Sequence, residues 1–187
     1  GNDLTSYINY TGLRKGDSDF EGYISNGDIN KNGLIDAYDI SVVATQLEGG
    51  VDNRGMEKVD GALEISTPKQ VYDKDEIIEI QVKGTGLRAV NAFSFALPYN
   101  QQDYEFVGVE LQNMNAMENL TYDRLHTNGS KALYPTFVNV GNKKTLEGTV
   151  DLCLLKFKAK RKVKFDLKVI DGLLVDKKLN THKSSVQ

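Results

Sequence analysis

The fold is decided by the stretch Glu76-Ile77-Ile78-Glu79-Ile80-Gln81-Val82-Lys83. Its polar and apolar residues alternate, and in an extended chain successive side chains point to opposite faces. Residues 91–99 repeat this alternation, so both runs predict β-strands with one buried face. The apolar positions that share the pattern are Ile78, Ile80, Val82, Phe93, Phe95, Leu97 and Tyr99.

Outward from these two runs, other apolar stretches recur at short intervals, joined by loops that contain Gly, Asn and Pro. Many short strands at such spacing are typical of an antiparallel β-sandwich. We therefore expect a mostly β fold, an antiparallel jelly-roll sandwich. The further strands are expected at residues 61–66, 104–111, 132–140, 150–159, 163–169 and 172–176.

The second face of residues 91–99 carries the small side chains of Ala92, Ser94 and Ala96. Small residues on a strand face indicate that another element packs closely against it. The pattern favours a neighbouring loop of the same domain as this cover. A separate element docked on the strand is the alternative.

A short amphipathic helix is expected to begin at Ala37. Apolar residues recur there at i, i+3, i+4 and i+7, which places them on one side of a helix. Gly49-Gly50 supplies the left-handed residue that ends many helices. The apolar stripe consists of Ile40, Val43, Ala44 and Leu47.

Residues 28–39 have the spacing of a calcium-binding loop. Calcium takes about 6–8 oxygen ligands, and oxygen-bearing side chains stand here at loop positions 1, 3, 5, 9 and 12. Gly33 occupies position 6, where such loops bend sharply. A turn that is merely rich in Asp and Asn has no reason to combine this spacing with an exit helix. The predicted ligands are Asp28, Asn30, Asn32, Leu34 through its backbone carbonyl, Asp36 and Asp39.

A second loop, with a weaker match, begins at Asp17 and overlaps the first. Gly22 occupies its position 6, but it is followed by the other loop and not by a helix. A second calcium ion and a solvated acidic loop both remain open, so we expect one Ca²⁺ ion or two. The second ligand set would be Asp17, Asp19, Glu21, Tyr23, Ser25 and Asp28.

Residues 27–40 resemble the loop-helix repeat of a dockerin, the calcium-dependent docking module of bacterial polysaccharide-degrading proteins. The resemblance covers about residues 17–49. It implies a dockerin-like calcium-binding module over residues 1–50, followed by a charged linker at residues 51–60.

Residues 61–187 are similar to a cohesin domain, the receptor for dockerins. This resemblance implies a cohesin-like β-sandwich domain. The stretches that carry it are residues 75–82, 93–99, 106–109 and 152–159.

Together the two resemblances imply the C-terminal tail of a Bacteroides-type secreted glycoside hydrolase, located extracellularly, in the periplasm or at the cell surface. The expected partner is the other module of the same chain, packed in cis, or a cohesin- or dockerin-type protein. Polysaccharide is a further candidate. Packing of the two modules in cis is supported by their net charges, which have opposite signs. Residues 1–60 hold eleven acidic and five basic side chains, and residues 61–187 hold fifteen acidic and eighteen basic.

Basic residues alternate with apolar ones over residues 156–168, which would place the bases on the outer face of a hairpin. This favours a solvated face that discourages edge pairing, with an acidic partner as the alternative. The formal net charge is −3 and no binding motif is present, so we expect no nucleic acid partner. No apolar run approaches the roughly 18 residues of a membrane span. The bases are Lys156, Lys158, Lys160, Arg161, Lys162, Lys164 and Lys168.

The sequence indicates no catalytic centre. His126 and His182 are the only histidines; both are expected at the surface. Sugar-binding sites stack aromatic rings on pyranoses, and the chain has nine tyrosines but no tryptophan. We therefore expect a non-catalytic, calcium-stabilised interaction module, with a carbohydrate-binding module as the alternative. Buried or rim positions are the favoured use of the tyrosines. The candidates for a stacking platform are Tyr99, Tyr104, Tyr122 and Tyr134.

Overall fold

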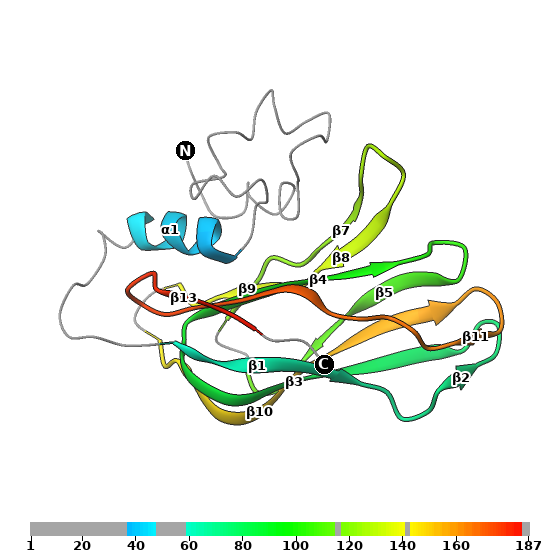
Figure 1. Ribbon diagram of the computed structural model, residues 1–187, viewed down its shortest axis with the longest axis horizontal. Coiled ribbons are helices and arrows are strands. Elements are labelled where there is room, and N and C mark those ends of the chain that lie inside the picture. The colour runs from blue at the N-terminus through cyan, green and yellow to red at the C-terminus, as the bar shows by residue number, and fades with distance from the viewer. Residues whose placement is uncertain (1–36, 48–58, 115–116, 141–142, 185–187) are drawn as a thin grey trace.

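The computed structural model describes residues 37–47, 59–114, 117–140 and 143–184 (Figure 1). Two antiparallel sheets face each other across an apolar interior, and a helix lies on the outer side of the second sheet. The predicted mostly β, antiparallel sandwich is confirmed. Among these residues, no helix has the length and hydropathy needed to cross a membrane.

The first sheet has the order β1-β3-β10-β5, and each neighbouring pair is antiparallel. Burial alternates along β3 as the sequence predicts, because Ile78 and Ile80 are buried while Glu79 between them is exposed. Glu79 stands opposite Lys156 of β10, so the outer face of this sheet is charged and of mixed sign. The strands are β1 (Asp60–Ser66), β3 (Ile77–Val90), β5 (Tyr104–Leu111) and β10 (Leu146–Ala159).

The second sheet has the order β13-β12-β4-β8-β7, with β9 paired to β4 and β6 paired to β9. The predicted strand over residues 132–140 is divided in two by Pro135, which has no N–H to donate to a neighbouring strand. The strands are β4 (Ala92–Tyr99), β6 (Glu118–Asn119), β7 (Tyr122–Leu125), β8 (Lys131–Tyr134), β9 (Thr136–Val138), β12 (Ile170–Val175) and β13 (Thr181–Lys183).

The predicted strand over residues 163–169 is largely wrong. Only β11 (Val163–Lys164) is extended and paired, and its partner is β2 (Val71–Tyr72). The expected hairpin with residues 150–159 therefore does not form. Instead β10 lies between β3 and β5 inside the first sheet, so its lysines are not on an edge strand and cannot discourage edge pairing.

The core between the sheets is aromatic at one end. The Phe157 ring makes edge-to-face contacts with the rings of Tyr99, Tyr104 and Phe106, at centroid distances of 5.1, 6.3 and 5.5 Å. Phe93 and Phe137 pair at 5.1 Å within the second sheet. Burying one such side chain stabilises the fold by about 1.5–3 kcal/mol. The contact between Phe157 of β10 and Tyr99 of β4 joins the two sheets.

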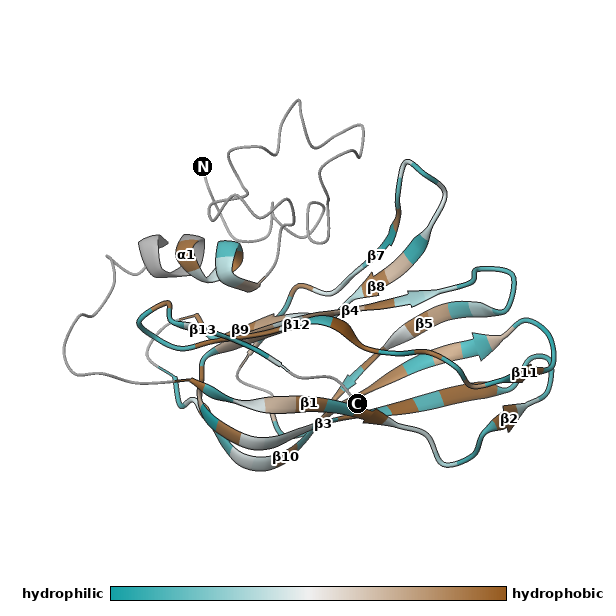
Figure 2. Cartoon of the chain, viewed as in Figure 1, coloured by the Kyte–Doolittle hydropathy of each residue, from teal (hydrophilic) through white to brown (hydrophobic). Residues whose placement is uncertain are grey.

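The helix α1 spans Ala37–Leu47, as the apolar stripe predicts. The expected stop signal at Gly49-Gly50 lies outside the described residues. Figure 1 shows α1 on the outer side of the second sheet, away from β1, β3 and β10. Its neighbours in space are β4, β9 and β12. In Figure 2, β4 and β12 include brown, hydrophobic segments.

Candidate functional site: a helix-docking face

Strand β4 is covered on both of its faces. Every residue from Ala92 to Leu97 is buried. Phe93, Phe95 and Leu97 point into the core between the sheets. The alternate residues Ala92, Ser94 and Ala96 must therefore face the outer side, and they are buried there by something other than the core. This outer side is the candidate site.

The first turn of α1 packs on this outer side. Ala37 and Ile40 are fully buried, and they form one apolar cluster with Ala92 of β4 and Val175 of β12. The cluster is separate from the main core. Ala92 has only a methyl group, which allows the helix to approach the sheet closely. The remaining buried members of the cluster are Leu120 and Val138.

Ser94 fixes the start of the helix. The backbone N–H of Ala37 donates a hydrogen bond of 3.0 Å to Ser94 Oγ, and the bond is buried. The first N–H groups of an α-helix have no partner within the helix. A side-chain oxygen normally satisfies one of them from the residue just before the helix. Here a strand 57 residues away supplies that oxygen, so the sheet itself caps α1.

The predicted close packing on the small face of residues 91–99 is thus confirmed, and the alternative cover is the one found at Ala92 and Ser94. The favoured cover was a loop of the same domain, but a helix from the segment before the sandwich contacts both residues. Sequence spacing could not identify this cover, because the contact joins two residues that are 57 positions apart.

The face continues beyond α1 towards the β7–β8 hairpin. Ala96, Ala132 and Tyr134 form a small buried cluster of their own. Arg124 stands opposite Ala132 in the β7–β8 register, so it shares this outer face. The guanidinium lies 4.5 Å from the centroid of the Tyr122 ring, a distance typical of a cation–π contact. Arg124 is only 8% exposed.

Of the predicted calcium ligands, the described residues include Asp39 alone. Asp39 lies in the first turn of α1, as position 12 of the loop requires, and its side chain is fully buried. A buried carboxylate must be matched by a cation or by hydrogen-bond donors, and the role of Asp39 as a calcium ligand stays a prediction. No group of three or more His, Cys, Asp or Glu residues suited to a metal ion occurs among the described residues. The other predicted ligands lie outside them: Asp17, Asp19, Glu21, Tyr23, Ser25, Asp28, Asn30, Asn32, Leu34 and Asp36.

Buried or rim tyrosines were the favoured prediction, and the structure agrees with it over the alternative of a sugar-stacking platform. Tyr99, Tyr104 and Tyr134 are all buried, so none of them offers a ring face to a ligand. Burial, then a hydrogen bond to Asp123, raises the pKa of the Tyr99 phenol well above its ordinary value. Tyr122 is half-buried, and the Arg124 guanidinium lies over its ring. The four tyrosines serve packing and hydrogen bonding.

His126 is also not at the surface, contrary to the prediction. It is buried beside Tyr134, and its Nε2 atom is 2.5 Å from the Tyr134 hydroxyl. His126 directly follows β7, and its backbone N–H donates to the Ser130 carbonyl oxygen within the hairpin at 2.8 Å. His182 is partly exposed, and its Nε2 lies 3.3 Å from Asp60 Oδ1.

Four basic residues of β10 and the turn after it have acidic or carbonyl partners. Lys156 lies 3.9 Å from Glu110, and Lys158 lies 3.6 Å from Asp75. Lys160 donates to the Gln101 carbonyl oxygen at 2.8 Å, and Arg161 pairs with Asp103. These exposed pairs contribute little stability each. They nevertheless balance the charge, so this surface is not a uniform basic patch.

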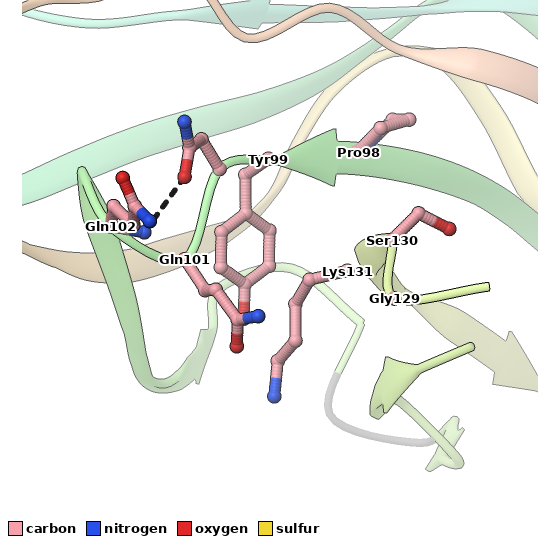
Figure 3. A pocket seen from close by; sticks show the side chains of 8 residues that line it. Pro98, Tyr99, Gln101, Gln102, Gly129, Ser130 and Lys131 are labelled. Atoms are coloured by element: carbon pink, nitrogen blue, oxygen red, sulfur yellow. Dashed lines mark hydrogen bonds between the residues drawn. The ribbon is translucent and has the colours of Figure 1, made fainter. Parts of the chain in front are cut away.

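A hollow of about 580 Å³ lies between the β4–β5 loop and the β7–β8 hairpin (Figure 3). In Figure 3 the Lys131 side chain runs beside the Tyr99 ring, with the Gln101 amide close by. Tyr99 and Lys131 both contact Asp123, at 2.5 and 3.3 Å. The hollow is lined by Pro98, Tyr99, Asn100, Gln101, Gln102, Gly129, Ser130 and Lys131.

The sandwich is similar to cohesin domains of known structure. A type II cohesin domain from the cellulosome of Acetivibrio cellulolyticus superposes with a TM-score of 0.52 and 11% identity, over 67% of this chain and 90% of that one. The cohesin module of a family 33 glycoside hydrolase from Clostridium perfringens gives 0.50 and 16%, over 70% and 93%. The sandwich has the cohesin fold. The predicted cohesin-like architecture is therefore confirmed.

A third cohesin was solved as a complex with a dockerin, both from Clostridium thermocellum. It matches this cohesin-like sandwich with a TM-score of 0.50 and 13% identity, over 72% of this chain and 94% of that one. No protein-family model and no curated protein matches the sequence. At such low identities the likeness establishes the fold of the sandwich alone.

Proposed function

We propose that this chain is a non-catalytic interaction module in which a cohesin-like sandwich holds a calcium-loop helix of its own chain. The contact that carries the proposal is the first turn of α1 on β4, β9 and β12, with the Ala37 N–H bonded to Ser94 Oγ. Cohesins of the same fold occur in complexes with dockerins. Here the loop-helix element that resembles a dockerin stands on the same chain.

Calcium would act by fixing the start of this helix. A loop closed around the ion at residues 28–39 holds position 12, Asp39, in the first helical turn. The same turn carries Ala37 and Ile40 onto the sheet. Metal binding and docking would therefore stabilise the same residues, and each should strengthen the other.

The cellular role follows from the same resemblance. One cohesin of this fold is a module of a family 33 glycoside hydrolase. We infer that this chain is likewise appended to a secreted polysaccharide-degrading enzyme, outside the cytoplasm. Its task there would be to organise the parent enzyme through docking, in cis or with a cohesin- or dockerin-type protein.

The decisive experiment measures whether calcium binding stabilises the sandwich against unfolding in the full 187-residue chain. Calorimetric titration gives the number of ions, and melting curves with calcium or chelator give the coupling. A ligand present at 100 times its Kd stabilises the state it binds by about 2.7 kcal/mol. We expect calcium to raise the sandwich transition in the wild type and much less in Ser94→Trp, where the indole would occupy the place of Ala37.

Glu79→Trp is the matched control, because Glu79 is exposed on the outer face of the first sheet. It should respond to calcium like the wild type. Near-UV circular dichroism checks that each variant retains the sandwich. If calcium does not bind, or if it raises the transition of Ser94→Trp as much as that of the wild type, the docking proposal is rejected.

A saccharide-binding role is the second candidate, and the hollow beside Tyr99 is the feature that favours it. Its exposed amides and hydroxyl can exchange hydrogen bonds with sugar hydroxyls. A glycan array separates the two functions. Specific binding that is lost in Gln101→Ala and Gln102→Ala would favour the saccharide role, and no binding above background would remove it.

A further inference from the structure

The turn between β12 and β13 contains a leucine in a conformation that leucine rarely adopts. Leu179 has a φ angle of 66°, which lies in the left-handed region. The Cβ atom of an L-residue is crowded by a carbonyl oxygen there, so glycine and asparagine are the usual residues. A bulky side chain persists at such a position only where the surrounding structure compensates for the strain. The surroundings of Leu179 therefore indicate what this turn does.

Hydrogen bonds within the turn hold its backbone in this shape. Asp176 is buried, its carbonyl oxygen accepts from the Leu179 N–H at 3.2 Å, and its N–H donates to the Asn180 carbonyl oxygen at 3.1 Å. Its Oδ1 accepts from the N–H groups of Lys178 and Asn180, each at 2.9 Å, and its Oδ2 accepts from the Asn180 side-chain amide at 3.0 Å. These five bonds join residues 176–180 to one another, so they fix the turn without a contribution from α1. A contact residue on such a pre-organised turn loses little further freedom when a helix docks.

The Leu179 side chain adds to the apolar surface under α1. Leu174 points into the core between the sheets, so its neighbours Leu173 and Val175 face outward. Val175 belongs to the buried cluster that includes the first turn of α1, and Leu173 and Leu179 pack against that cluster. In Figure 1 the turn between β12 and β13 lies beneath α1. The turn thus extends the apolar surface beyond the last residue of β12.

We propose that Leu179 helps to determine which helix docks, because the β12–β13 turn presents it as a fixed apolar contact for the first turn of α1. The inference rests on the proposed cis docking and adds a second determinant to Ser94. Ser94 accepts the N–H at which the helix begins, and Leu179 requires an apolar side chain on the helix beyond that point. Ile40 supplies it here, as the larger of the two buried residues that α1 contributes to the cluster. The face therefore fits a helix whose first residue is small and whose fourth is a branched aliphatic residue.

Leu179→Asn in the full chain tests this contact. Asparagine adopts the left-handed conformation more readily than leucine, so the turn should persist while its apolar contact is lost. Hydrogen exchange, read by NMR, separates the two effects. We expect the amides of α1 to exchange about fivefold faster, because the half-buried leucine contributes only part of the stabilisation of a fully buried one. The amides of β3 and β10 should keep their rates.

Two further variants serve as controls. Leu179→Met keeps an apolar side chain of similar volume and should keep the wild-type exchange rates in α1. Asp75→Asn places the same asparagine at another left-handed position, with a φ angle of 72°, in the turn before β3. Asp75 is exposed and lies outside the cluster at α1, so this variant should also leave α1 unchanged. The proposal is overturned if Leu179→Asn exchanges like the wild type in α1, or if Leu179→Met speeds the exchange as much as Leu179→Asn does.

A double-mutant cycle identifies the helix residue that Leu179 contacts. Ile40→Ala shortens the side chain on the helix, and it should itself speed exchange in α1. We expect Leu179→Asn to add less than about twofold in the Ile40→Ala background, because the contact that it removes is already lost. An undiminished effect of Leu179→Asn in that background contradicts the contact.

These outcomes separate the inference from the function on which it rests. If calcium raises the wild-type transition but not that of Ser94→Trp, while Leu179→Asn leaves exchange in α1 unchanged, docking stands and the role of Leu179 fails. If Leu179→Asn speeds the exchange while calcium has no effect on the transition, the Leu179 contact stands and the calcium-coupled function fails.

Discussion

Ala37 and Ser94 are 57 residues apart in the sequence, and the N–H of the first is bonded to the hydroxyl of the second at 3.0 Å. One residue begins the only helix among the described segments, and the other lies in the middle of a strand that is buried on both faces. The bond therefore joins α1 to the sandwich that follows it in the sequence. It also fixes which end of α1 contacts β4, because only the amino end of a helix has backbone N–H groups without partners inside the helix.

Ser94→Ala should weaken the docking of α1 and leave the sandwich intact. Removal of a capping oxygen typically costs about 1 kcal/mol. Hydrogen exchange measures this locally, and we expect the amides of α1 to exchange about fivefold faster, while those of β3 and β10 keep their rates. Ser66→Ala, at an exposed end of β1, is the control. Unchanged exchange in α1 would show that the bond does not hold the helix.

Ala92→Leu should lift the helix by adding three carbon atoms beneath it. Ala92 is fully buried in the cluster with Ala37 and Ile40, and overfilling a packed contact costs about 1–3 kcal/mol. We expect a lower denaturation midpoint and faster exchange in α1. Glu79→Leu adds a similar apolar side chain on the exposed face of β3 and should change stability by less than about 0.5 kcal/mol. Equal effects of the two substitutions would place α1 away from Ala92.

Phe157→Ala tests the aromatic end of the core. The ring contacts those of Tyr99, Tyr104 and Phe106, and its side chain is fully buried. Removing a buried phenylalanine costs about 3–5 kcal/mol, measurable by denaturant titration. Val107→Ala is the control in the neighbouring strand, because Val107 is 54% exposed. A loss of similar size in both variants would contradict the position of Phe157 in the core.

The strands that were predicted best from the sequence are those in which apolar residues alternate regularly with other residues. Residues 76–83 and 91–99 contain an apolar residue at every second position, and both runs lie in long strands of the structure. The missed strands β2, β6, β7 and β13 have two to four residues each, too few to show a period. Residues 163–169 do have the period, but their chain pairs with β2 for only two residues. Pairing partners are set by tertiary contacts that alternation does not encode.

The sequence predicted that the outer face of β4 is covered, but it did not predict which element covers it. Ala92, Ser94 and Ala96 indicated that something packs closely on β4, because charged side chains would otherwise face solvent there. The identity of the cover is set by the long-range contact between α1 and β4, which no local sequence pattern records. The burial of Arg124 was missed for a related reason. An arginine in a short polar strand gives no sign of burial until the elements around it are placed.

Cys153 should be inert in the folded protein. The thiol is fully buried in the core, and burial raises its pKa from 9.0 to about 12. The reactive species is the thiolate, which is therefore almost absent at pH 8. We expect no labelling by iodoacetamide until denaturant unfolds the sandwich. The same shift bears on stability, because the unfolded thiol ionises above pH 9 while the folded one stays protonated. Stability should thus fall as the pH rises from 9 towards 12, and Cys153→Ala should lose this part of the alkaline slope. Labelling of the native protein at the rate of a free thiol would contradict the burial of Cys153.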